Sequence, residues 1–154
     1  MANTAHNQAL VGLTHLFLPE MISEERGRIL NIASTAAFQP GPYMSVYYAT
    51  KAFVLSFSQA LQYELRGSNV TVTVHCPGPT ESSFAAQAGN DKTLLFKSGQ
   101  VATSRAVAEH AYHSMMLGRK VVAHGLINKF TATFAPFTPV WLTNFLAARI
   151  NSPV

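Results

Sequence analysis

Short β-branched runs alternate with long helical patterns along this chain, and this alternation constrains its fold more than any other feature. The run Val70–His75 is rich in valine and threonine, which is typical of a strand buried on both faces of a sheet. Apolar residues at helical spacing fill residues 46–66 before it, and recur from Thr103 or Ser104 to about Leu117 after it. Strands that alternate with helices predict a parallel sheet with right-handed crossovers.

The other predicted elements complete a single α/β domain of about three strands over residues 1–154. Arg28–Ala33 and Val121–Ala123 are the further strands. Residues 4–23 form an amphipathic helix in which Pro19 predicts a kink or an early stop. Gly67 is the expected C-cap of the 46–66 helix. Residues 78–102 are expected to form a long loop with room for one short helix, and residues 130–154 a tail of helix and loop.

Composition narrows the class of partner. Hydrophobic residues make up 48% of the chain and charged residues only 12%, whereas about 25% charged is usual, so part of the apolar surface is expected to meet a partner. The net charge of +4 includes no basic run, which argues against nucleic-acid binding. No apolar run reaches the ~18 residues of a membrane span. A single cysteine, Cys76, and an N-terminus without signal-peptide features favour the cytoplasm.

Tyr47 and Lys51 carry the clearest chemical signal. They lie four residues apart in a helical stretch, so the phenol and the ammonium group share one helix face. A nearby cation favours the phenolate, and the pair therefore predicts a lowered pKa for Tyr47 and a role in proton transfer. Ser34 lies upstream at the end of the first predicted strand.

Together these residues resemble the short-chain dehydrogenase/reductase family, whose signature is Tyr-x-x-x-Lys with a serine at about this distance upstream. The strand that leads to Ser34 and the turn Pro77-Gly78-Pro79-Thr80 after the second strand are similar to the same family. The likeness covers roughly residues 6 to 130 and implies a partial, Rossmann-like, three-layer parallel sheet. It also implies that the first strand lies at an open edge of that sheet.

The resemblance implies an NAD- or NADP-dependent oxidoreductase acting on a small carbonyl compound or secondary alcohol. By this resemblance, Tyr47 is expected to transfer a proton to or from the substrate oxygen, and Ser34 to hydrogen-bond that oxygen. Lys51 is expected to bind the nicotinamide ribose. Cofactor contacts fall to Tyr47, Lys51, Pro77, Gly78, Thr80 and Ser82. The chain contains no Gly-x-x-x-Gly-x-Gly or Gly-x-Gly-x-x-Gly motif, so the resemblance implies that the glycine-rich, phosphate-binding half of the family is missing and that activity is impaired.

Two other functions remain open from the sequence. The chain could be a non-catalytic remnant that forms a homo-oligomer through its first helix and the 46–66 helix, which build subunit interfaces in the family. It could also hydrolyse esters, with Ser34 as a nucleophile activated by Tyr47 and Lys51.

Histidines add little to the sequence-based prediction. By resemblance, His6 occupies the place of an asparagine that holds a water in the family's proton relay. His110 and His113 share a helical face, but no third ligand follows from the spacing. Zinc sites need three or four ligands, so no metal site is predicted.

Overall fold

The computed structural model describes residues 2–81 and 101–152, and Ser82 lies outside them. Its main sheet has the order β1-β2-β5, and every pair is parallel. These strands are β1 (Gly27–Ile32), β2 (Val70–Cys76) and β5 (Val121–Ala123). Gly27 lies opposite Val70, and Val74 lies opposite Val121. The predicted parallel α/β sheet of three strands is confirmed.

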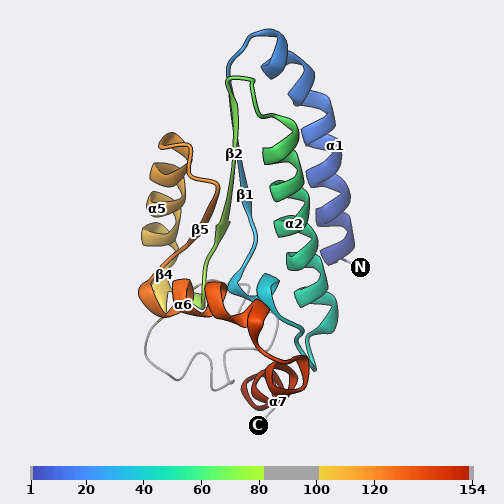
Figure 1. Ribbon diagram of the computed structural model, residues 1–154, viewed down its shortest axis with the longest axis vertical. Helices are drawn as coiled ribbons and strands as arrows, with labels where there is room; N and C mark the ends of the chain where they lie inside the picture. The colour runs from blue at the N-terminus through green and yellow to red at the C-terminus, as the bar shows by residue number, and fades with distance from the viewer. Residues whose placement is uncertain (1, 82–100, 153–154) are drawn as a thin grey trace.

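Helices cover both faces of this sheet, as Figure 1 shows. The helices α1 (Ala2–Ser23) and α2 (Ser45–Glu64) pack together on one side, and α5 (Ser104–Met116) packs against β1 and β2 on the other. The helices α6 (Leu126–Phe134) and α7 (Val140–Asn151) lie beyond the carboxyl ends of the strands. Four short elements complete the order: the 3-10 helices η1 (Thr35–Phe38) and η3 (Ala135–Phe137), and a parallel pair of two-residue strands, β3 (Thr80–Glu81) and β4 (Ala102–Thr103).

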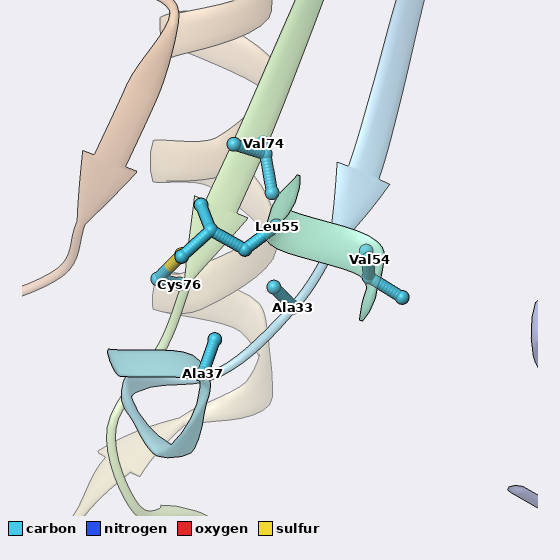
Figure 2. Packing of buried hydrophobic residues seen from close by; sticks show 6 residues of the cluster. All are labelled: Ala33, Ala37, Val54, Leu55, Val74 and Cys76. Atoms are coloured by element: carbon cyan, nitrogen blue, oxygen red, sulfur yellow. The ribbon is translucent and has the colours of Figure 1, made fainter. Parts of the chain in front are cut away.

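Alternation along β2 explains the packing. Successive side chains of a strand point to opposite faces of the sheet. Val74 and Cys76 are fully buried and cluster with Val54 and Leu55 of α2, as Figure 2 shows. The intervening side chains of β2, which include the fully buried His75, therefore face the side of α5. Nearly all of β2 is buried, as its β-branched run predicts.

The residues that begin or end helices agree with the sequence-based expectations in only some cases. Thr103 caps α5 as predicted, because its hydroxyl accepts a hydrogen bond of 3.3 Å from the amide of Ala106. Pro19 does not stop α1, which continues to Ser23. Gly67 lies two residues beyond Leu65, the observed C-cap of α2, and its φ of 95° is in the region that favours glycine.

Two wider features bear on function. Among the described residues, β1 pairs only with β2, so its other edge is open, as expected. No helix in the described ranges is long and apolar enough to cross a membrane.

Candidate active site

Ser34 is held in place by the pairing between the ends of β1 and β2. The amide of Ala33 donates to the carbonyl of His75 at 2.8 Å, and the amide of Thr35 donates to the carbonyl of Pro77 at 2.9 Å. Ser34 itself has an extended backbone and caps η1, because its hydroxyl oxygen accepts a hydrogen bond of 3.2 Å from the amide of Ala36. This double anchoring fixes the serine beside the Pro77–Thr80 turn.

Tyr47 and Lys51 reach the same place from the first turns of α2. The Nζ atom of Lys51 lies 5.8 Å from the centroid of the Tyr47 ring and donates a hydrogen bond of 3.1 Å to the carbonyl of Ile32. The side chains of Tyr47 and Ser34 are hydrogen-bonded to each other. The structure therefore brings together the three residues that the sequence singled out.

Electrostatics at this site differ from the sequence-based expectation. Burial raises the pKa of Tyr47 above its usual value of 10, although the hydrogen bond with Ser34 opposes the change. Burial likewise lowers the pKa of the Lys51 ammonium group. The expectation of a lowered tyrosine pKa is wrong, because the cost of removing the phenolate from water outweighs the hydrogen bond with Ser34 that favours it. Tyr47 is a protonated phenol at neutral pH.

The Pro77–Thr80 turn closes the other side of the site. Its backbone is tightly packed, because a Cβ atom on Gly78 would overlap the side-chain amide of Asn128 in α6. The Thr80 hydroxyl donates a hydrogen bond of 3.0 Å to the carbonyl of Gly78, which stabilises the turn. Pro77, Gly78 and Thr80 all line the same cleft as Ser34, Tyr47 and Lys51.

This close contact makes a first prediction. The Gly78→Ala change is expected to destabilise the fold by about 1–3 kcal/mol, because the new methyl group must displace Asn128. The Asn128→Ala change removes the obstructing amide, so Gly78→Ala should cost clearly less in that background. Urea unfolding of the two single variants and the double variant measures the coupling. Equal costs of Gly78→Ala in both backgrounds would show that the contact does not limit this turn.

The cleft has a volume of about 1290 Å³ and runs along the open edge of β1. On one side it is bounded by α1 and α2, and on the other by α5. His6 and Asn7 of α1 also line it. The Oδ1 atom of Asn7 is buried and has no hydrogen-bond partner among the described residues. This oxygen can therefore accept a hydrogen bond from a group bound in the cleft.

Sequence reasoning missed the contribution of the C-terminal helices. Asn128 of α6 and Asn151 of α7 both line the cleft, and Asn151 lies within residues 130–154, for which the sequence predicts only a tail of helix and loop. The amide of Asn151 donates to the carbonyl of Pro42 at 3.1 Å and to the hydroxyl of Tyr48 at 3.2 Å. No local motif marks either asparagine, because their roles depend on contacts with residues far away in the sequence.

The donors in the cleft fit one end of a nicotinamide cofactor. Hydroxyl groups of Ser34, Tyr47 and Thr80 and the ammonium group of Lys51 can bind a sugar, an amide and a substrate oxygen. Cofactor phosphates need a glycine-rich turn at a helix N-terminus, and no such motif occurs in the 154 residues. The residues present therefore fit the nicotinamide ribose end and not the phosphates.

Comparisons with known proteins agree with this geometry. A family model described as short chain dehydrogenase matches residues 5–93. The chain is 29% identical to the mouse inactive hydroxysteroid dehydrogenase-like protein 1 over 140 residues, which are 90% of this chain and 41% of that protein. It is 42% identical to an NADP-dependent 3-hydroxy acid dehydrogenase of Salmonella typhi over 90 residues, which are 56% of this chain and 36% of that protein.

A solved short-chain dehydrogenase structure is also similar to this chain. The short-chain dehydrogenase of Sphingobium yanoikuyae in complex with NADPH is 29% identical, with a TM-score of 0.70, and the match covers 82% of this chain and 49% of that one. This chain thus spans about half the length of the solved relative, and less than half of the two curated relatives.

Proposed function

Because this chain belongs to the short-chain dehydrogenase family, we propose that it carries the catalytic half of an NAD- or NADP-dependent oxidoreductase. The substrate class is a small carbonyl compound or a secondary alcohol. One observation supports the proposal above all: the hydrogen-bonded pair Ser34 and Tyr47 lies with Lys51 in a large cleft, beside the tightly packed turn at Gly78.

Each side chain has a defined task in this proposal. A bound nicotinamide supplies or accepts the hydride. The phenol of Tyr47 donates its proton to the carbonyl oxygen during reduction, and the phenolate of Tyr47 accepts the proton of the alcohol during oxidation. The Ser34 hydroxyl holds the substrate oxygen next to that phenol, and the Lys51 ammonium group binds the nicotinamide ribose and stabilises negative charge that develops on the oxygen. Pro77, Gly78, Thr80 and Ser82 are proposed to border the nicotinamide.

The cofactor phosphates have to be bound elsewhere. We propose that further polypeptide, either from the same protein or from a partner, pairs with the open edge of β1 and brings the phosphate-binding turn with it. The open edge supports this proposal, since an unpaired strand offers a row of free backbone groups for another strand. The cleft along the same edge leaves room for the cofactor between the two parts.

A direct test uses reduced nicotinamide mononucleotide, which lacks the adenosine half, beside NADPH and NADH. The chain is mixed with each nucleotide at high concentration and with a panel of aldehydes and ketones. The proposal predicts oxidation of the reduced nicotinamide that depends on both the chain and the carbonyl compound. No carbonyl-dependent oxidation with any of the three nucleotides would count against catalysis by this chain.

The raised pKa of Tyr47 predicts how the rates depend on pH. Reduction needs the protonated phenol, which is present throughout the neutral range because the pKa lies above 10. Oxidation needs the phenolate, which becomes abundant only as the pH rises through that pKa. We therefore expect reduction to be level between about pH 6 and 9 and alcohol oxidation to increase over the same range. Rates at saturating substrate measure this, and an oxidation rate that levels off near pH 7 would show a lowered pKa instead.

A second candidate function is a non-catalytic interaction module that forms a homo-oligomer. The exposed apolar side chains of α1 favour it: Leu13, Leu16 and Phe17 are 55%, 68% and 49% exposed. Such residues are expected to lie in an interface between helices. Light scattering across a range of concentrations tests the oligomer, and an oligomer without turnover under the conditions above would favour this function. A strictly monomeric chain would argue against it.

Ester hydrolysis has weaker support. The high pKa of Tyr47 leaves little phenolate to deprotonate Ser34, and the serine oxygen already accepts a hydrogen bond from the amide of Ala36. Ester turnover without any nicotinamide, lost in the Ser34→Ala variant, would be the evidence for it.

The location of the protein in the cytoplasm also stays a prediction.

A further inference from the structure

Three histidines from separate parts of the sequence meet on the face of the sheet that α5 covers. His75 lies on β2, His110 on α5, and His124 directly follows β5. One ring nitrogen from each can be chosen so that all three atoms lie within 4.8 Å of one another. Half of the six histidines of the chain are therefore gathered at one point, and none of the three lines the cleft that holds Ser34 and Tyr47.

The distances approach those of a metal centre. The Nε2 atom of His75 lies 3.0 Å from the Nδ1 atom of His110. The ring centroid of His124 lies 4.9 Å from that of His110 and 6.5 Å from that of His75. Zn–N bonds of about 2.0–2.1 Å place two ligand nitrogens of a tetrahedral site about 3.3 Å apart. The three nitrogens lie within 4.8 Å of one another, so a bound ion would have to draw them closer together.

Hydrogen bonding within the cluster leaves two buried ring nitrogens without a partner among the described residues. A single hydrogen bond can join His75 to His110. The Nδ1 atoms of His75 and His124 are nevertheless buried, and neither has a hydrogen-bond partner among the described residues. A buried polar atom without a partner destabilises the fold, and such atoms are uncommon in native proteins. Either nitrogen could instead bind an ion directly or, after ring rotation, donate to a neighbouring group.

The electrostatic environment of the cluster favours the neutral form of His75 and of His110. The pKa of His75 is lowered to about 4, mainly by burial and in part by the neighbouring His110 and His124. Burial also lowers the pKa of His110, with added effects of His124, Lys129 and Arg119. A neutral imidazole has a free lone pair, which a metal ion requires, so His75 and His110 need not lose a proton to bind an ion at neutral pH. The positive charges of Lys129 and Arg119 oppose a cation as well, and they limit the affinity expected.

We propose that His75, His110 and His124 form a binding site for a divalent transition-metal ion, with Zn²⁺ as the expected ion and a water at the fourth position. Imidazole nitrogens suit Zn²⁺, and three protein ligands with one open position is an established arrangement for it. The ion would join β2, α5 and the end of β5 at one point. Because His75 lies two residues before Pro77, it would also stiffen the strand end that leads to the cleft. This inference does not depend on the proposed oxidoreductase activity.

The site could not be found from sequence spacing. His113, which shares a helical face with His110 in the sequence, is exposed in the structure and is not a member of the cluster. The actual neighbours of His110 are His75 on β2 and His124, which directly follows β5, and the sheet brings both beside α5. The proposed site departs from the sequence-based prediction of no metal site.

The test is a titration of the metal-free 154-residue chain with Zn²⁺ and with Co²⁺. We expect one equivalent of tight Zn²⁺, visible ligand-field bands of four- or five-coordinate Co²⁺, and a rise in Tm on the order of 5 °C at a free Zn²⁺ concentration about 100 times Kd. The His110→Ala and His124→Ala variants should each lose the Co²⁺ bands and at least about tenfold in affinity. His113→Ala and His15→Ala replace exposed histidines and should bind as the parent chain does.

Three titration results would contradict the proposed metal site. The inference is overturned if the parent chain binds no Zn²⁺, or if it binds Zn²⁺ with the same affinity after His110→Ala and His124→Ala. It is also overturned if only the His113→Ala or His15→Ala variant loses binding, which would place the metal on surface histidines. Circular dichroism of each variant checks that a loss of binding does not come from unfolding. His75 is left unchanged because it is fully buried.

Discussion

Replacing Tyr47 with phenylalanine is expected to lower carbonyl reduction by about 10²- to 10⁴-fold, the usual contribution of a positioned general acid. The change removes the hydroxyl that is hydrogen-bonded with Ser34 and leaves the ring in place. The fold should therefore be unaffected, and nucleotide binding should change little. Steady-state rates with the most rapidly oxidised nicotinamide nucleotide and the best carbonyl substrate measure the effect.

Tyr63→Phe is the matched control for this variant. Tyr63 lies on the same helix but is 65% exposed, and it does not line the cleft. We expect it to retain the rate of the parent chain. Equal rates for Tyr47→Phe and the parent chain would show that another group protonates the substrate oxygen, and the assignment of Tyr47 would be wrong.

Replacing Lys51 with methionine is expected to weaken the binding of reduced nicotinamide nucleotides by about 10- to 100-fold, as the loss of one charge-assisted hydrogen bond implies. Methionine preserves most of the apolar stem that packs in the half-buried position, so the loss should come from the missing charge. The quenching or enhancement of nicotinamide fluorescence on binding measures Kd for each nucleotide.

A second lysine variant separates this effect from net charge. Lys120 is exposed and is not among the residues that line the cleft, so Lys120→Met changes the charge of the chain by the same amount at a remote place. Its affinity should equal that of the parent chain. If Lys51→Met also binds as the parent chain does, the ammonium group does not contact the cofactor and serves only to hold the carbonyl of Ile32.

Local patterns were sufficient to predict most of the sheet and its helices. The β-branched run of β2 and the helical spacing of α2 and α5 depend on neighbours in the sequence, and all three elements lie where these patterns place them. The convergence of Tyr47 and Lys51 follows in the same way from one turn of a helix. Ser34 was identified by its place at the end of the first predicted strand and by the family resemblance, which supplies its spacing from Tyr47.

Properties that depend on tertiary burial could not be predicted. The pKa of Tyr47 was expected to fall because the sequence shows the neighbouring lysine but not the burial that dominates. Asn151 gave no signal, since its partners Pro42 and Tyr48 are more than a hundred residues away. The three-histidine cluster was missed for the same reason, because its members belong to β2, α5 and the end of β5.

The central claim is that this chain holds the nicotinamide end of the cofactor without its phosphate site, and calorimetry of the parent chain tests it most directly. Reduced nicotinamide mononucleotide, NADH and NADPH are titrated separately into the 154-residue chain. We predict saturable binding of the mononucleotide, with the dinucleotides no more than about tenfold tighter, a difference of about 1.4 kcal/mol. Heats of dilution alone for all three nucleotides would contradict the claim and leave Ser34, Tyr47 and Lys51 without a cofactor.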